Sequence, residues 1–163
     1  MQRALAPALA SGLVMAIIGA LGWAAGVPWL FPSLGPTIAI QAEASDSPVA
    51  RPWNVVVGHF IGAAVGFAAV RLSGVIHEPA MNLSHALTPP RVAAASLAVL
   101  VSMGLQALAR ANHPPAQATT LLVVVGALDA DLHGAMVLAA GVLLVAALGE
   151  PVRRASLGKR RSD

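Results

Sequence analysis

The sequence predicts an all-α polytopic membrane protein with four full transmembrane helices, two short half-helices and an internal two-fold repeat. Of the 163 residues, 57% are hydrophobic and only 10% are charged, whereas a soluble domain carries about 25% charged residues. Four apolar stretches are long enough to cross a bilayer, and two shorter ones follow proline-rich breaks. Because so few charges cannot cover a globule in water, the lipid bilayer is the expected partner.

The four predicted spans are rich in Ala, Val, Leu and Gly and are nearly free of charge. They cover residues 6–26, 54–72, 91–109 and 133–149. The first follows Met1-Gln2-Arg3, a start that also fits a secretory signal peptide, but its apolar stretch is longer than a signal core. We therefore expect a retained span.

Two apolar stretches are too short to be ordinary spans. Residues 33–42 follow Pro28-Trp29-Leu30-Phe31-Pro32, and residues 116–128 follow Asn112-His113-Pro114-Pro115. At about 1.5 Å per residue, ten helical residues cover about half of the hydrocarbon thickness. These stretches are predicted half-helices whose ends lie inside the membrane.

The two halves of the chain resemble each other. Residues 32–37 and 114–119 share the pattern Pro-x-x-x-x-Thr, and both follow a full span and precede another. We therefore predict one transmembrane domain over residues 1–163, built from halves 1–72 and 91–149 with a connector at 73–90 and a basic cytoplasmic tail at 150–163.

The orientation of the repeat is open at this stage. If each half-helix reaches the opposite side of the membrane, the second half is inverted; if each turns back, the halves are parallel. Either arrangement places eight of the ten Lys and Arg residues on the side of the termini. Both therefore put the two termini in the cytoplasm.

The proline-led breaks are the strongest candidates for function. Irregular backbone survives at membrane depth only inside protein or against a watery cavity. The start of each half-helix offers N–H groups and the positive end of a helix dipole, which suit a small anion. Ser33, Thr37 and Thr119 add hydroxyls, and Gly35 permits close approach. The alternative is that the prolines make simple turns at the membrane surface.

Polar residues inside or beside the spans extend this candidate site. His113, with a reference pKa near 6.5, is either a proton-sensitive group or a neutral partner of the broken backbone. Asn54 and His59 either bind solute or fix helix packing. The predicted substrate-binding residues are Ser33, Gly35, Thr37, Asn54, His59, Asn112, His113, Pro114, Pro115, Gln117 and Thr119.

Other features carry no predicted chemistry. Gly58, Gly62 and Gly66 form a small-residue stripe for helix packing. The acidic and histidine residues in 129–133 are expected to form a solvated turn and not a metal site. There is no cysteine, phosphate loop or zinc-binding helix motif. We expect no enzyme activity, no cofactor and no nucleic-acid partner.

Three stretches resemble a known family. Residues 111–119 (Ala-Asn-His-Pro-Pro-Ala-Gln-Ala-Thr), 32–37 and 47–59 occur in the order and spacing of the HPP family of integral membrane proteins, named for its His-Pro-Pro tripeptide. The resemblance extends over residues 5–149. It departs from the commoner pattern at His59 and at Gln117, where a glycine often stands.

The resemblance implies a function. Plant members of the family are implicated in nitrite transport across the chloroplast envelope, and most bacterial members have no assigned function. The sequence thus favours a multi-pass transporter or channel of the bacterial inner (cell) membrane, with an inorganic anion such as nitrite as first candidate solute. The alternative is a non-transporting assembly or interaction subunit. A homo-oligomer is also expected, with the glycine stripe as a contact surface.

Overall fold

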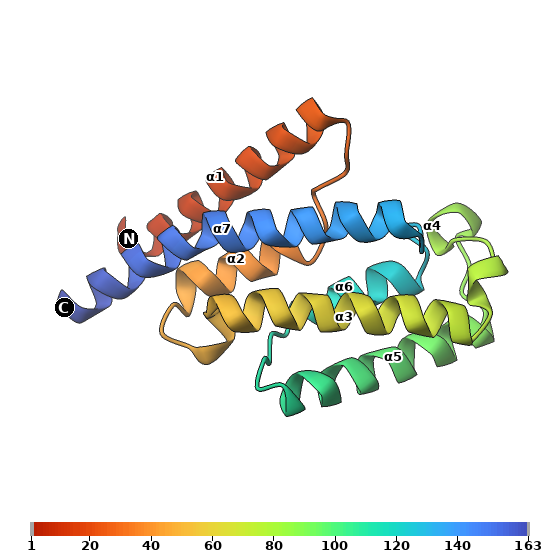
Figure 1. Ribbon diagram of the computed structural model, residues 1–163. Helices are drawn as coiled ribbons and strands as arrows, with labels where there is room; N and C mark the ends of the chain where they lie inside the picture. The colour runs from red at the N-terminus through yellow and green to blue at the C-terminus, as the bar shows by residue number, and fades with distance from the viewer. Residues whose placement is uncertain (1, 163) are drawn as a thin grey trace.

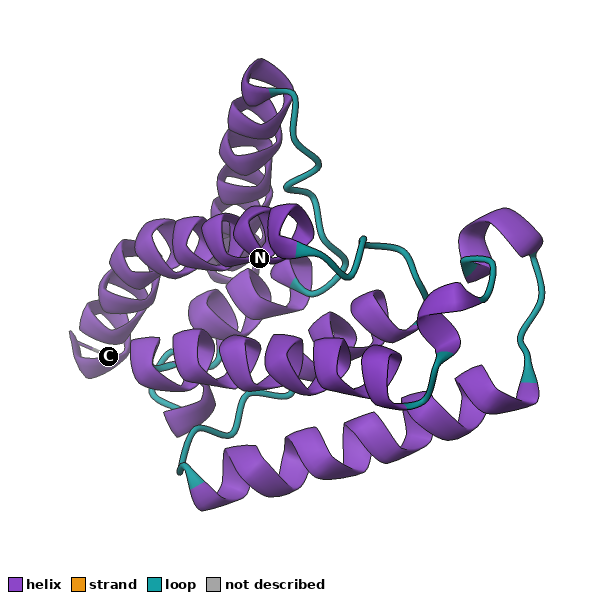
Figure 2. Ribbon diagram, turned by 45° about the vertical axis from the view of Figure 1, so that its right-hand side comes forward, coloured by secondary structure: helices purple, strands orange, loops and turns teal. Residues whose placement is uncertain are grey.

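The computed structural model describes residues 2–162, without the side chains of residues 2–4, 82 and 159–162. Within that range the chain is helical and contains no strand (Figure 2). The long helices are α1 (Gln2–Ala25), α3 (Pro52–Leu72), α5 (Pro89–Leu108) and α7 (Leu132–Ser162). The short ones are α2 (Leu34–Glu43), α4 (Met81–Ser84), α6 (Ala116–Val124) and the 3-10 turns η1 (Pro48–Ala50) and η2 (Val75–His77).

The four long helices confirm the predicted spans, since each is long and apolar enough to cross a membrane. Two begin earlier than the hydropathy pattern indicated, because Pro52 and Pro89 occupy first helical positions, where the missing N–H costs nothing. Helix α7 also continues through the predicted tail as far as Ser162. Residues 150–162 are therefore a helical extension of the last span.

Both half-helices are present. Helix α2 has 10 residues and α6 has 9, so each covers about half of the hydrocarbon thickness. Helix α6 ends at Val124 and not at residue 128, because the chain turns through Gly126 with φ of 78°. A Cβ at Gly126 would lie 2.9 Å from that of Ala80, so both φ and space favour glycine.

The repeat is inverted. In Figure 1, α1 runs away from the end that holds both termini, and α2 begins near the middle and returns to it. Helix α5 runs toward that end, and α6 begins near the middle and runs away from it. Each half-helix therefore completes a crossing begun by the extended segment before it. The parallel arrangement left open by the sequence is excluded.

Matching turns precede the two half-helices. After α1, Gly26 adopts the left-handed region and Val27 N donates to Gly22 O at 2.9 Å. After α5, Arg110 adopts the same region and Ala111 N donates to Gln106 O at 2.8 Å. Both are the six-to-one closure of a Schellman turn. The lead-in segments, residues 26–33 and 109–115, thus start from the same local geometry.

The two halves are interlocked. Helix α2 packs against α1 and α7, whereas α6 packs against α5 and α3. Each half-helix therefore lies along the last long helix of the other half. The central pair α3 and α7 also contact each other, and α1 and α5 lie at the periphery (Figures 1 and 2).

The core and the lipid-facing surface follow from this arrangement. Ile18, Leu34, Ile38 and Leu138 are at most 1% exposed and join α1, α2 and α7 in one apolar cluster. Large apolar side chains on the outer faces of α1 and α5 are exposed, among them Leu9, Leu13, Leu97 and Leu100. Exposed apolar faces on peripheral helices are what hydrocarbon requires.

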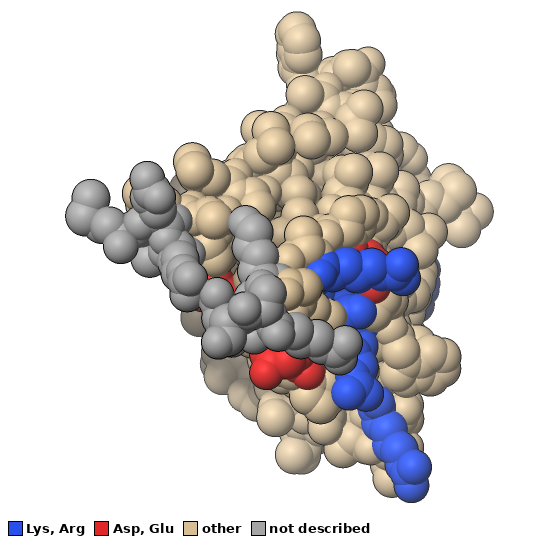
Figure 3. Space-filling model, turned by 90° about the vertical axis from the view of Figure 1, so that its left-hand side faces the viewer, with Lys and Arg blue, Asp and Glu red and all other residues tan. Residues whose placement is uncertain are grey.

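The two ends of the bundle differ in charge. The terminal end, at which the first and last helices begin and end, carries arginine side chains with a few acidic ones (Figure 3). The arginines described at this end are Arg51, Arg110, Arg153 and Arg154. The connector end, formed by residues 73–88, is flanked by Arg71 and Arg91.

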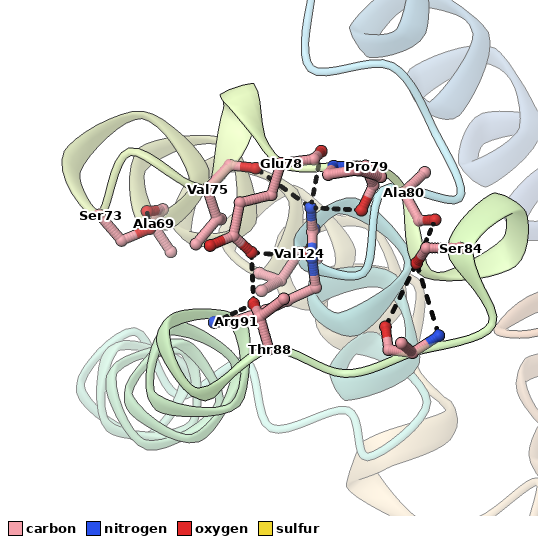
Figure 4. Close-up of polar contacts among 11 residues, drawn as sticks. Ala69, Ser73, Val75, Glu78, Pro79, Ala80, Ser84, Thr88, Arg91 and Val124 are labelled. Atoms are coloured by element: carbon pink, nitrogen blue, oxygen red, sulfur yellow. Dashed lines mark hydrogen bonds and ion pairs between the residues drawn. The ribbon is translucent and has the colours of Figure 1, made fainter.

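Arg91 fixes the connector against the end of α6. Its guanidinium donates to Val124 O, the last carbonyl of α6, and to the carbonyls of Val75, Glu78 and Pro79 at 3.1, 3.1 and 3.2 Å (Figure 4). Its side chain is 3% exposed, and Nε lies 3.8 Å from the Glu78 carboxylate. A single buried cation thus neutralises the negative end of α6 and holds the connector in place.

Candidate functional site

The first turns of the two half-helices meet in a buried polar cluster, the central cluster, made of Ser33, Thr37, His59, His113 and Thr119. Each of these side chains is at most 2% exposed. Thr119 Oγ1 of α6 donates to the Ser33 hydroxyl at 3.0 Å, which joins the two half-helices directly. His59 of α3 lies between them, with Nε2 2.9 Å from Thr37 Oγ1 and Nδ1 2.7 Å from Thr119 Oγ1.

Thr37 connects the two histidines. Its Oγ1 lies 2.9 Å from His59 Nε2, 3.0 Å from His113 Nε2 and 2.8 Å from the carbonyl oxygen of Ser33. The two imidazole rings are 4.9 Å apart at an angle of 62°. The sequence predicted all five cluster residues individually, and the structure brings them together.

The partners of His113 restrict its protonation. Nδ1 lies 2.8 Å from Val49 O, and because a carbonyl can only accept, Nδ1 carries a hydrogen. A neutral His113 then accepts at Nε2 from the Thr37 hydroxyl. A doubly protonated His113 donates from Nε2, and the Thr37 hydroxyl turns to Ser33 O. The Thr37 hydroxyl carries one hydrogen, so it can donate to only one of His59 Nε2, His113 Nε2 and Ser33 O at a time.

Side chains around the central cluster hold the lead-in segment before α6 by hydrogen bonds. Gln106 Oε1 accepts from His113 N at 3.1 Å, and Gln106 Nε2 donates to Ser102 Oγ at 3.1 Å. Thr120 Oγ1 donates to the same Ser102 hydroxyl at 3.3 Å. Asn54 Nδ2 donates to Asn112 O at 2.9 Å. Asn54 thus fixes the broken backbone, the packing role that the sequence left open.

Backbone N–H groups contribute less than the sequence predicted. In the first turn of α6, the N–H groups of Ala116, Gln117 and Ala118 donate to the carbonyls of the preceding turn at 2.9, 3.1 and 3.1 Å. Leu34 N at the start of α2 donates to Phe31 O at 3.0 Å. These groups are occupied because each proline-led segment forms its own tight turn before the helix. The polar capacity of the central cluster therefore comes from hydroxyls and imidazoles.

The glycine stripe of α3 is a packing device within the chain. A Cβ at Gly58 would lie 2.8 Å from His113 Cβ, and one at Gly62 would lie 2.6 Å from Ala116 O. At Gly66 it would lie 3.0 Å from Thr120 O. The stripe therefore lets α6 and its lead-in segment approach α3 closely. The expectation that it serves as a contact surface between copies was wrong, since α6 covers it.

Several predicted site residues lie outside the central cluster. Pro114 and the side chain of Asn112 are exposed, and Pro115 is the buried N-cap of α6. A Cβ at Gly35 would meet nothing within 4 Å, so no neighbour approaches there. Gln117 is half-buried, and its Oε1 has no hydrogen-bond partner among the described residues. These five residues form the frame of the breaks and not the cluster itself.

Sequence reasoning missed five buried polar residues around the cluster. They are Gln41, Ser45, Ser102, Gln106 and Thr120, each at most 2% exposed. Spacing could have found four of them, because Gln41 and Ser45 continue a four-residue period from Ser33 and Thr37, and Ser102 and Gln106 are also four apart. Residues four apart share a helix face.

A pocket of about 290 Å³ lies at the connector end. Its lining includes Pro28, Leu83, Asp129, His133 and Val137. Trp29 Nε1 donates to the carbonyl oxygen of Val137, one of the lining residues, at 3.1 Å. The acidic turn beside it holds the start of α7, since Asp131 Oδ1 accepts from Gly134 N at 2.7 Å.

Among the described residues, no group of three or more His, Cys, Asp and Glu is placed to hold a metal ion.

Comparison with known proteins agrees with this architecture. The family described as HPP, transmembrane region, matches residues 1–160. A transmembrane protein of Dictyostelium discoideum is 34% identical over 80 residues, 49% of this chain and 24% of that protein, so the match spans about a quarter of the relative. No solved structure matches the chain. With nearly its whole length matched, the chain belongs to the HPP family of integral membrane proteins.

Proposed function

We propose that this protein transports a small polar solute through the bilayer, with an inorganic anion such as nitrite as first candidate. The observation that carries the proposal is the 3.0 Å contact between Thr119 and Ser33, which joins the first turns of two antiparallel half-helices inside a fully buried polar cluster. A polar layer at membrane depth is costly and is typical of a transport route.

The chemistry of the central cluster supports an anion. The positive ends of the α2 and α6 dipoles converge on it, and its side chains are hydroxyls and imidazoles, which can donate hydrogen bonds to an oxyanion. Among the residues that the structure describes, no carboxylate hydrogen-bonds to the cluster. The named relative says nothing of solute, so nitrite comes from the resemblance to plant family members.

The interlocked halves support a mechanism of alternating exposure. The five cluster side chains are closed off, at most 2% exposed, and bond to one another. Binding a solute therefore requires the half-helices to separate. Because α2 is packed on α7 and α6 on α3, a relative shift of these two pairs would open the cluster to one side at a time.

We further propose a cell-membrane location with both termini in the cytoplasm. Eight of the ten basic residues belong to the terminal end in the inverted arrangement, including Arg51, Arg110, Arg153 and Arg154. The positive-inside rule places such an end in the cytoplasm.

Nitrite uptake into proteoliposomes tests the proposal. We expect uptake above that of empty vesicles, and its loss in Thr119→Val and His113→Ala, because each change removes a cluster hydrogen bond. Ser96→Ala is the matched control, since the exposed Ser96 donates only to Val92 O at 2.9 Å of its own helix. Absence of nitrite, nitrate and formate uptake by the unaltered protein would refute the anion proposal and favour the assembly-subunit alternative.

A further inference from the structure

A stripe of polar residues runs along one face of α2 from the central cluster to the terminal end. The α2 stripe consists of Ser33, Thr37, Gln41 and Ser45, spaced four residues apart, and each side chain is at most 2% exposed. Thr37 and Gln41 lie within α2, Ser33 is its N-cap and Ser45 follows its C-cap Ala44. At about 1.5 Å per helical residue, the part from Ser33 to Ala44 covers about 16 Å. It joins the middle of the membrane to the surface at which α2 ends.

The two halves of the α2 stripe differ in hydrogen bonding. Ser33 and Thr37 belong to the central cluster and are paired. In contrast, Oε1 and Nε2 of Gln41 and Oγ of Ser45 have no hydrogen-bond partner among the described residues. A buried amide with both ends unpaired is strongly unfavourable, most of all at membrane depth. Its retention therefore needs a reason outside the packing of the protein.

The repeat shows that packing does not require an amide at this position. Gln41 faces Gly149 of α7, where a Cβ would collide with the Gln41 amide. In the other half, Gly66 of α3 faces Val123 of α6, where a Cβ would lie 3.0 Å from Val123 Cβ. Val123 is 1% exposed. An apolar side chain fills the same niche in the second half, so the polar one in the first half serves something else.

The terminal end of the stripe lies beside a cation. Arg153 Nη1 of α7 donates to Ser45 O at 3.1 Å, and Arg153 Nε lies 2.7 Å from the Glu150 carboxylate. Arg154 binds the same carboxylate at 2.7 Å. Two guanidinium groups thus share one carboxylate beside Ser45, and Glu43 and Asp46 lie within two residues of it, so the stripe reaches the surface among charged side chains of both signs.

We propose that the α2–α7 contact is the solute route between the central cluster and the terminal end, with Gln41 as an intermediate binding position. Its occupants are water and a small inorganic oxyanion: the Nε2 hydrogens donate to the anion, and Oε1 accepts from water. This inference rests on the proposed transport function and assigns the path within it. The route is specific to the first half, since α6 carries Val123 in the corresponding place.

Cysteine accessibility tests the route without a transport assay. The chain has no cysteine of its own, so Gln41→Cys and Ser45→Cys each introduce a single thiol. Ile38→Cys is the matched control, because Ile38 lies on α2 within the apolar cluster and is 0% exposed. A negatively charged methanethiosulfonate reagent is added to the folded protein in detergent, with and without nitrite.

We expect the thiols at 41 and 45 to react at least about ten times faster than the one at 38, since access governs the reaction of otherwise similar thiols. Nitrite should slow the reaction at 41. A thiol at position 41 as unreactive as that at 38 would overturn the route, even if the unaltered protein takes up nitrite. Reactive thiols with no nitrite uptake would keep the polar route and refute the proposed solute.

A second variant separates transport from folding. Gln41→Leu removes both unpaired amide groups and keeps the volume, so we expect the thermal midpoint to be unchanged or higher. Uptake should fall about tenfold, the factor that corresponds to one lost hydrogen bond of ordinary strength. Full uptake in this variant would show that the solute does not use Gln41. Gln41→Asn, which keeps an amide, should retain more uptake than Gln41→Leu.

Discussion

Replacing Thr37 with valine tests whether the central cluster is held together by its hydrogen bonds. Valine has nearly the shape of threonine, so the change removes a hydroxyl without opening a cavity. It leaves Nε2 of His59 and Nε2 of His113 without the partner that each has at 2.9 and 3.0 Å. Leaving a buried polar group unpaired costs about 1–3 kcal/mol. Two such groups give an expected loss of about 2–6 kcal/mol in the free energy of unfolding.

Serine at the same position is the matched control. Thr37→Ser keeps the hydroxyl and loses one buried methyl group, for an expected loss of about 1 kcal/mol. Thermal unfolding of the purified protein in detergent should place the valine variant about 4–24 °C below the unaltered protein and clearly below the serine variant. If hydrophobic burial alone decided stability, the valine variant would have a higher thermal midpoint than the serine variant. A valine variant at least as stable as the serine one would refute a stabilising network.

Three further changes probe other parts of the fold. Arg91→Met should cost about 3 kcal/mol or more, because four backbone carbonyls lose their donor; faster proteolysis within residues 73–88 would register it. Gly62→Ala should lower the thermal midpoint, because its Cβ would lie 2.6 Å from Ala116 O, whereas Gly35→Ala, with nothing within 4 Å, should leave it unchanged or raise it. Single cysteines at Asp46 and Leu83, both exposed, should be labelled from the side of the termini and from the opposite side of the membrane, respectively; the reverse assignment would contradict the inverted repeat and fit the parallel one.

Much of the fold could be predicted from the sequence. Spans and half-helices follow from the length of apolar stretches, and prolines at 28, 32, 114 and 115 mark the breaks. The orientation of the repeat could not be predicted, because it depends on where residues 26–33 and 109–115 go in space. Both arrangements place eight of the ten basic residues on the side of the termini, so the positive-inside rule could not choose between them.

The central cluster was partly predictable. Its members are polar residues in apolar surroundings, which composition alone makes conspicuous. Their pairing was not, because the hydrogen bond between Thr37 and His113 joins residues 76 positions apart. Gln41 was not predicted, for a different reason. It lies in the apolar stretch 33–42, and one amide in ten residues barely changes the mean hydropathy of such a stretch. Only its burial without a partner distinguishes it.

The interlocking of the halves also constrains how the protein is made. Helix α2 emerges from the ribosome long before α7, its principal partner along with α1. Until residues 132–162 are synthesised, the part of α2 that packs on α7, including Gln41 against Gly149, has no helix to cover it, and the first half cannot settle into its final form. Insertion must therefore be followed by a late docking step, in which α7 closes over α2. Two separately expressed halves should accordingly accumulate only when they are produced together.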